Sequence, residues 1–560
     1  MPTMTGAQFL AETLHGYGVS HYFFMPVSVP EAMPEFDRVG ITPVMAHTEK
    51  GAAYMADGYA RLSGKIGVCG AQSVGALNLA AGLQDARLGC SPVLALTGRL
   101  SNLSQHRHAY QELDHMGPFG AVTKYSVPVT CVDELPVFLR QALREATSGT
   151  PGPAHLDLYG IAGGDVMTGT ADLDIVIEND FRHIPATRPA AAPESVQAVM
   201  TQIQAALRPV IVAGGGVRCS GARTELVELA EKLQVPVITS LNAKEMFPPD
   251  HELALGISGQ YSRFCANKAL AEADLVFFIG SHAGGQITND WRLPRPGTRV
   301  LQLDINPAEL GRSFPLTAGM QCDARTGLRQ LLETAESPSP QNSEARVLWL
   351  HRTQELVQEW HQSVSALSAS NDIPLRPERL CADLTRLLPN DAVLVSDTGH
   401  SGVWTGTMID LRSPEHSYIR CAGSLGWGLP AAIGAKCAAP ERPVLCFTGD
   451  GGMWYHLTEL DTAVRYGLHT ITLVNNNASL NQEQAMNERI YGARTANSDR
   501  MWMLTDADFS TIASTMGGLG ICVRRPDELE DALQEALAAD RPVVIDVKTH
   551  IEGIAPRAWD

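Results

Sequence analysis

The chain has 560 residues, of which 44% are hydrophobic and 19% are charged. This length and composition exclude a mini-protein and a disordered chain, and they predict two to four domains, each with its own core. The formal net charge of -18 repels phosphate backbones, so an extended nucleic-acid-binding surface is excluded as well. Small molecules are therefore the expected ligands.

Eleven cysteines are scattered along the chain, and none forms a Cys-x-x-Cys pair. This pattern indicates neither a zinc site nor a disulfide framework, and it is typical of buried thiols in a reducing compartment. The N-terminus lacks a basic segment followed by an apolar run, and no stretch reaches the roughly 18 apolar residues of a membrane span. We expect a cytoplasmic protein without a membrane partner.

Short apolar runs, each followed by a Gly-containing turn and a helical pattern, predict an α/β fold with three doubly wound parallel-sheet domains. We expect the domains at 1–182, 190–336 and 365–552, with linkers at 184–193 and 337–344. The first domain also has a predicted helix at 49–62. Predicted strands lie at 66–71, 92–97 and 154–158, then at 209–213, 235–240, 274–280 and 299–304, and finally at 392–396, 444–448, 470–474, 520–523 and 542–547.

Residues 444–477 predict one βαβ unit, in which apolar residues from Met453 to Val464 mark a single helix that ends near Gly467. Asp450 and Asn477, 27 residues apart, then follow neighbouring parallel strands, where ligands of open sheets bind. Oxygen ligands of this kind suit Mg²⁺. Three glycines would let the backbone approach a diphosphate at a helix N-terminus, namely Gly449, Gly451 and Gly452.

This Gly-Asp-Gly segment followed by an Asn run resembles the binding motif of thiamine diphosphate enzymes. The resemblance implies that Asn477 and the carbonyl of Ser479 complete the Mg²⁺ shell of Asp450. It also implies a pyrimidine-binding first domain, a nucleotide-binding-like central domain and a diphosphate-binding third domain.

Two further segments resemble motifs of the same family. The stretch AHTEKGAAYMADGYARLSG resembles the one that carries the activating glutamate, and Glu49 stands at the matching position. That carboxylate acts on the aminopyrimidine ring of the cofactor. The stretch CAGSLGWGLPAAIGA resembles the segment that bends the cofactor, which implies that Leu425 wedges between its rings and that the carbonyl of Gly423 accepts a bond from the aminopyrimidine.

Within the family the resemblance is closest to the acetolactate synthase branch. Residues 107–126 match its substrate-side segment at Tyr110 and Gln111, and Asn78 matches a cofactor-side position. The chain departs from that branch in both glycine-rich loops of the first domain, where Val27, Ser28 and Ser73 stand. It departs again after the Asn run, where the candidate substrate residues are Leu480, Glu483 and Met486, and Glu483 places a possible acid or base there.

The central domain has a Gly214–Gly216 run after a strand, which in the family can hold FAD or the ADP part of a CoA-type ligand. His282 occupies the position expected for a flavin-binding arginine. A CoA ester would need basic residues, for which Arg218, Arg263 and Arg292 are the candidates.

The resemblance implies a homodimer, or a dimer of dimers, whose active sites are shared between subunits. Two activities stay open. The first is a carboligase or lyase that acts on a small 2-oxo acid through a C2-ylide and an enamine, with Glu49, Gln111 and Glu483 as catalytic residues. The alternative is a 2-hydroxyacyl-CoA lyase that handles formyl-CoA and a ketone or aldehyde. A third possibility is a catalytically silent binding protein of the same fold.

Overall fold

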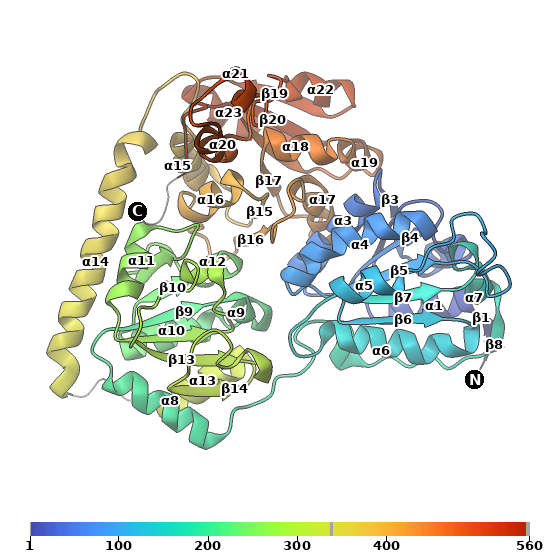
Figure 1. The fold of residues 1–560 in the computed structure, drawn as a ribbon, viewed down its shortest axis with the longest axis horizontal. Helices are drawn as coiled ribbons and strands as arrows, with labels where there is room; N and C mark the ends of the chain where they lie inside the picture. The colour runs from blue at the N-terminus through green and yellow to red at the C-terminus, as the bar shows by residue number, and fades with distance from the viewer. Residues whose placement is uncertain (1, 336–339, 556–560) are drawn as a thin grey trace.

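A computed structural model describes residues 2–335 and 340–555 of the chain. It contains three six-stranded sheets, all of them parallel, and one small antiparallel pair formed by β1 (Thr3–Thr5) and β8 (Thr170–Asp172). Figure 1 shows the three sheets as three lobes, with the first sheet in blue to cyan, the second in green and the third in orange to red. The predicted α/β class with three parallel-sheet domains is confirmed, whereas the exact domain limits stay a prediction.

The first sheet has the order β3-β2-β4-β5-β7-β6. Its strands are β2 (His21–Phe24), β3 (Thr42–Met45), β4 (Gly67–Gln72), β5 (Val93–Gly98), β6 (Tyr125–Val129) and β7 (Ala154–Leu158). The helices that position the site are α3 (Glu49–Ser63) before β4 and α4 (Ser73–Leu88) after it. A half-buried threonine cap begins α3, since the Thr48 hydroxyl accepts the Gly51 N–H at 2.8 Å.

The central sheet has the order β11-β10-β9-β12-β13-β14, which is the order of dinucleotide-binding folds. Its strands are β9 (Pro209–Ala213), β10 (Val237–Thr239), β11 (Ala254–Ile257), β12 (Leu275–Ile279), β13 (Arg299–Asp304) and β14 (Ala318–Gln321). The order reverses between β9 and β12, so the carboxyl ends of these two strands border a crevice. The Gly214–Gly216 run follows β9 at that point.

The third sheet has the order β16-β15-β17-β18-β20-β19, the same topology as the first. Its strands are β15 (Val393–Ser396), β16 (Ser417–Arg420), β17 (Val444–Gly449), β18 (Ile471–Asn476), β19 (Leu519–Val523) and β20 (Val543–Lys548). Predicted and observed strands agree to within one or two residues at each end, which is the usual uncertainty of strand limits.

Two predictions about helices need correction. The predicted linker at 337–344 is only partly a linker, because the long helix α14 (Pro340–Ser368) begins at Pro340, where a proline costs no helical hydrogen bond; residues 337–339 lie outside the described part. The predicted single helix after Asp450 is two helices, α18 (Asp450–His456) and α19 (Glu459–Arg465). The turn between them is tightened by i→i−3 bonds such as Leu460 N to Leu457 O at 3.1 Å.

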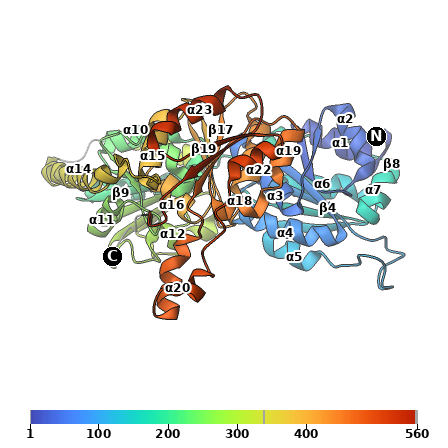
Figure 2. The ribbon, with the colours of Figure 1, turned by 90° about the horizontal axis from the view of Figure 1, so that it is seen from above.

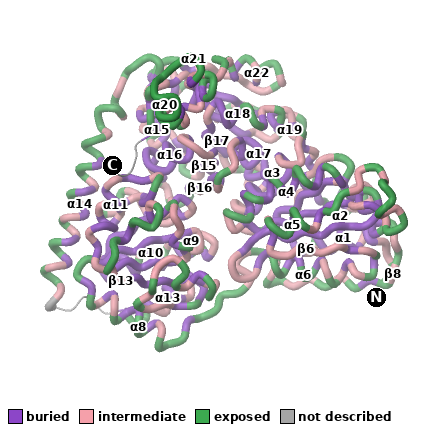
Figure 3. The backbone as a smooth tube through the Cα atoms, in the orientation of Figure 1, coloured by how far each residue is buried: buried purple, intermediate pink, exposed green. Residues whose placement is uncertain are grey.

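The first and third domains pack directly against each other through α3 and α17 (Gly428–Ala438). The helices approach closely, since a Cβ on Gly58 would lie 2.2 Å from the carbonyl oxygen of Ala431. Apolar side chains of both domains form one buried cluster there, including Ala53, Leu83, Leu429 and Ile433. A second cluster joins the central and third domains in the same way. Figure 3 shows buried segments of both domains where α3 and α17 lie side by side, and Figure 2 shows α20 (Gln484–Tyr491) projecting from the rest of the molecule.

Among the described residues, no helix is both long enough and apolar enough to cross a membrane.

Candidate active site

The first half of the candidate site lies at the carboxyl ends of β17 and β18. Gly449 stands opposite Asn475 in the parallel register, so the residues that follow each strand lie together. Asp450 is buried, and its carboxylate accepts the backbone N–H of Gly451 at 2.8 Å and of Ser479 at 2.9 Å. The Ser479 hydroxyl donates to Asn477 Oδ1 at 2.9 Å. The structure therefore brings Asp450, Asn477 and Ser479 into one cluster of oxygen atoms.

Burial raises the pKa of Asp450 to about 6, although the N–H groups of Gly451 and Ser479 act in the opposite direction. Because burial disfavours the ionised form of this carboxylate, a bound cation would stabilise it. A side chain at Gly451 would have to displace Leu480, since a Cβ there would lie 2.2 Å from Leu480 Cδ2. The donor set of one carboxylate, one amide oxygen and backbone carbonyls fits Mg²⁺.

The loop between β16 and α17 carries Gly423 and Leu425. Gly423 is exposed, a Cβ built on it meets no atom within 4 Å, and its carbonyl accepts no hydrogen bond from any described residue. Leu425 is half-buried. An open carbonyl next to a partly exposed aliphatic side chain fits the predicted contacts with an aminopyrimidine ring.

Asp397 also belongs to this region, although it is not among the predicted site residues. It follows β15 and is buried, and it accepts the N–H of Gly426 and of Gly428 at 3.1 Å each, and the Thr448 hydroxyl at 3.2 Å. Burial raises the pKa of Asp397 to about 6, against the effect of these donors. Its carboxylate ties the loop of Leu425 to the strand that ends in Gly449, and its place directly after a strand was the signal available in the sequence.

The second half of the candidate site lies at the start of α3. Glu49 is half-buried, and its carboxylate accepts a bond from Asn78 Nδ2 at 3.2 Å. Glu459 of the third domain accepts the backbone N–H groups of His47 and Thr48 at 3.1 Å each, just before Glu49. The third domain therefore fixes the start of the helix that carries Glu49, while the carboxylate itself faces α4.

Ser73 and Gln111 are in contact, as the Ser73 hydroxyl donates to the carbonyl oxygen of Gln111. The neighbouring Tyr110 is 86% exposed. Gln111 lies in the loop at 99–115, and the buried Asp157 holds both ends of this loop. Its Oδ2 lies 3.4 Å from Arg99 Nη1, and its Oδ1 lies 2.9 Å from His115 Nδ1. Asp157 is not among the predicted site residues, because an aspartate inside a strand gives no signal of its own in the sequence.

The remaining substrate-side candidates are spread over both halves. Ser28 is buried and its hydroxyl lies 2.7 Å from the Tyr22 hydroxyl, so its side chain points into the first domain, whereas Val27 is 44% exposed. Leu480 lies beside Gly451, and Met486 on α20 is 45% exposed. The half-buried Glu483 carboxylate has no hydrogen-bond or ion-pair partner among residues 2–335 and 340–555.

The two halves of the candidate site are not bonded to each other within the described part of the chain. In the part of the chain that the structure describes, no hydrogen bond or ion pair joins Glu49, Asn78, Ser73 or Gln111 to Asp450, Asn477 or Ser479. The chain thus presents two separate groups of candidate residues, one on the first domain and one on the third.

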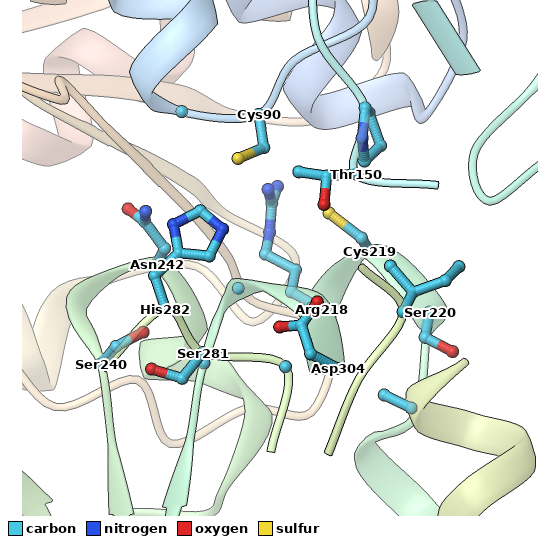
Figure 4. Close-up of a pocket in the computed structure, with 18 of the residues that line it drawn as sticks. Cys90, Thr150, Arg218, Cys219, Ser220, Ser240, Asn242, Ser281, His282 and Asp304 are labelled. Carbon is cyan, nitrogen blue, oxygen red and sulfur yellow. The ribbon is translucent and has the colours of Figure 1, made fainter. Parts of the chain in front are cut away.

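A cavity of about 270 Å³ lies at the strand-order reversal of the central sheet. Figure 4 shows Cys90 and Thr150 of the first domain on one side, opposite Arg218 and Asp304 of the central domain. Gly214, His282 and Arg218 line it as the sequence suggested. Arg263 does not, because its guanidinium pairs with Asp410 at 2.6 Å elsewhere, and Arg292 is also absent from the lining.

Three models of thiamine pyrophosphate enzyme domains match the chain: the N-terminal TPP binding domain at residues 4–117, the central domain at 196–331 and the C-terminal TPP binding domain at 397–547. A probable acetolactate synthase large subunit of Methanocaldococcus jannaschii is 32% identical over 97% of this chain and 92% of that protein. The acetolactate synthase isozyme 3 large subunit of Escherichia coli is 30% identical over 98% and 95%. A putative thiamine pyrophosphate-containing protein, YdaP, of Bacillus subtilis is 31% identical over 98% and 92%.

Proposed function

Because this chain belongs to the thiamine pyrophosphate enzyme family, we propose that it is a Mg²⁺-dependent carboligase or lyase that acts on a small 2-oxo acid. The observation that carries the proposal is the cluster of Asp450, Asn477 and Ser479 at the joined ends of β17 and β18. This cluster offers the oxygen ligands that Mg²⁺ needs next to a backbone that leaves room for a diphosphate.

In this proposal the third domain holds the cofactor. Asp450, Asn477 and the carbonyl of Ser479 would bind Mg²⁺, and the backbone of Gly449, Gly451 and Gly452 would face the diphosphate. When bound, thiamine diphosphate supplies a carbon nucleophile that adds to the carbonyl of the substrate. Leu425 would support the bent shape of the cofactor, and the free carbonyl of Gly423 would accept a hydrogen bond from its amino group.

Glu49 would hold a proton at the far ring nitrogen of the aminopyrimidine. The support is its place at the start of a helix fixed from both sides, by Thr48 and by Glu459, with Asn78 as a neutral partner that leaves the carboxylate free to exchange a proton. Asn78 and Ser73 would line the same end of the cofactor.

The substrate would lie between the two halves. Gln111 and Tyr110 would reach it from the first domain, together with Val27 and the backbone of Ser28. Leu480, Glu483 and Met486 would reach it from the third. Since the Glu483 carboxylate has no partner among the described residues, we assign to it the proton transfer to or from the substrate, with Gln111 orienting the substrate carbonyl.

The lack of a hydrogen bond or ion pair between the two halves, among the described residues, supports a homodimer, or a dimer of dimers, with shared sites. Exposed apolar side chains flank each half, with Val74 and Leu77 on α4 and Trp454 and Tyr455 on α18. A partner subunit would cover these side chains and bring its Glu49 to this chain's Asp450. The proposal includes neither a nucleic acid nor a membrane, and it places the enzyme in the cytoplasm, in keeping with its eleven free cysteines.

A second candidate is a 2-hydroxyacyl-CoA lyase, which the cavity of the central domain favours. The dinucleotide-type strand order, the Gly214–Gly216 run and Arg218 suit FAD or the ADP part of CoA. His282 in the lining offers no permanent positive charge for a diphosphate, so Arg218 would make that contact with either ligand.

Product analysis tests the proposal. The purified protein with thiamine diphosphate and Mg²⁺ receives pyruvate in one reaction, and formyl-CoA with a ketone or aldehyde in another. Acetolactate or acetoin from pyruvate would support the 2-oxo acid enzyme, and a 2-hydroxyacyl-CoA with pyruvate untouched would support the lyase. Tight cofactor binding without turnover in either reaction would support the third possibility, a catalytically silent binding protein.

A further inference from the structure

The carboxylate of Asp85, in the first domain, accepts hydrogen bonds from the backbone of the third domain. Asp85 lies on α4 of the first domain and is fully buried. Its oxygens accept three consecutive N–H groups of the third domain, from Ala422 at 2.8 Å, Gly423 at 3.1 Å and Ser424 at 3.0 Å. Three adjacent N–H groups that converge on one carboxylate form an anion-binding nest, in which each bond is strengthened by the charge.

These three residues belong to the loop that carries Gly423 and Leu425. The second half of the same loop is held by Asp397, through the N–H groups of Gly426 and Gly428. Two buried carboxylates thus hold the loop, Asp85 of the first domain and Asp397 of the third. Among residues 2–335 and 340–555, only Asp85 accepts the N–H groups of the peptides on both sides of Gly423, and it therefore orients the open carbonyl between them.

Pairing with Arg61 does not by itself explain Asp85. Arg61 is already matched by Asp57, which accepts from its Nε at 2.8 Å and its Nη2 at 2.7 Å. Asp85 adds a second negative charge, 2.9 Å from Arg61 Nη2, which one arginine cannot neutralise alone. Burial would raise the pKa of Asp85, but Arg61 and the N–H groups of Ala422 and Ser424 outweigh it and lower the pKa. The loop N–H groups therefore stabilise the negative charge of Asp85 that Arg61, already paired with Asp57, does not neutralise.

We propose that Asp85 is a positioning residue for the cofactor: it holds the Gly423 carbonyl and the Leu425 side chain in the orientation that the bent cofactor requires. The inference rests on the proposed function for the identity of the ligand. It concerns a residue outside the Mg²⁺ and activator groups, and it makes the first domain responsible for the shape of a binding loop in the third domain of the same chain.

The test compares full-length wild type with Asp85→Asn. The variant keeps the shape of the side chain but turns one acceptor oxygen into a donor that faces the loop N–H groups. Glu225→Gln on α10 (Arg223–Leu233) is the matched control, because it also removes a buried carboxylate paired with arginine, at 2.6 Å from Arg325 Nε, far from the loop. Hydrogen exchange of the amides of residues 422–424 is measured without cofactor, and thiamine diphosphate affinity is measured at saturating Mg²⁺.

We expect Asp85→Asn to speed exchange of these amides and to weaken thiamine diphosphate binding, each by about tenfold or more, which corresponds to the loss of one to two charged hydrogen bonds. Glu225→Gln should change neither. Cofactor affinity of Asp85→Asn equal to that of wild type or of the control would overturn the inference. If Asp85→Asn does not fold, Asp85→Glu serves instead, since it keeps the charge for Arg61 and moves the oxygens away from the nest. A wild type that binds no thiamine diphosphate would refute the proposed function, and unchanged amide exchange in the variant would then refute the role of Asp85 separately.

Discussion

The backbone N–H of Ser479 donates to Asp450 Oδ2 at 2.9 Å and so joins the segments that follow β17 and β18. Through this bond one carboxylate orders the loop that contributes the other two candidate Mg²⁺ ligands. Replacing Asp450 with Ala should therefore remove a ligand and loosen the loop together. We expect the affinity for thiamine diphosphate in the presence of Mg²⁺ to fall by at least about 100-fold, measured by calorimetric titration. Asp527→Ala, on the exposed surface of the same domain, is the control, and equal affinity of both variants would refute the metal site.

Replacing Glu49 with Gln tests the activator. The amide has the same size and still meets Asn78, so cofactor affinity should be unchanged. It cannot hold the proton of the ring nitrogen, so kcat should fall by about 10²–10⁴-fold, and exchange of the thiazolium C2 proton in D₂O should slow as well. Glu145→Gln on the exposed face of the first domain should behave as wild type. A Glu49→Gln enzyme with normal turnover would require another activator.

Mixing these two inactive variants tests whether the sites are shared. In a dimer with sites formed by both subunits, a heterodimer of Glu49→Gln and Asp450→Ala chains carries both changes in one site and neither in the other. After subunit exchange, about a quarter of wild-type activity should return, since half of the dimers are mixed and each has one intact site. Each variant alone provides the baseline. Mixtures that stay inactive, although mass spectrometry detects mixed dimers, would place both halves of a site in one chain.

Arg61 lies between two buried carboxylates, with its Nη2 at 2.7 Å from Asp57 and 2.9 Å from Asp85. Replacing it with Gln leaves two buried negative charges without a cation. We expect a loss of about 3–5 kcal/mol of stability, seen as a lower midpoint of thermal unfolding. Arg541→Gln removes an exposed pair with Asp540 and should leave the midpoint unchanged. Equal midpoints for the two variants would show that the buried network contributes nothing.

His456 predicts how stability depends on pH. Burial lowers the pKa of His456 to about 4, and its Nδ1 has no hydrogen-bond partner among the described residues. The unfolded chain takes up a proton near pH 6.5 and the folded chain only near pH 4, so stability is complete above 6.5 and decreases as the pH falls between these values. The loss should reach about 3 kcal/mol.

In a His456→Phe variant, which keeps the ring that packs edge-on against Tyr54, the difference in melting temperature from wild type should shift in favour of the variant between pH 7 and pH 4.5. A difference that stays constant over this range would contradict the assignment.

Sequence patterns predicted the fold class, because each sheet follows from alternating apolar runs and glycine turns. They also placed Asp450 and Asn477 together, since both follow strands of one βαβ unit and the carboxyl ends of parallel strands meet at one edge. Asp397 obeys the same rule and could have been found from its place after β15. The hydrogen bonds from residues 422–424 to Asp85 could not have been found from the sequence, because they depend on how two domains distant in sequence pack. The roles of the candidate site residues stay predictions.

The shared cores have a consequence for the way in which the molecule unfolds. Ala53 and Leu83 of the first domain are buried against Leu429 and Ile433 of the third, and the central domain shares a core with the third as well. An isolated first domain would expose these apolar surfaces to water. Although the three lobes look like separable modules in sequence, they should lose their structure in one cooperative step, and a cut in the 184–193 linker should leave a nicked protein whose pieces stay together.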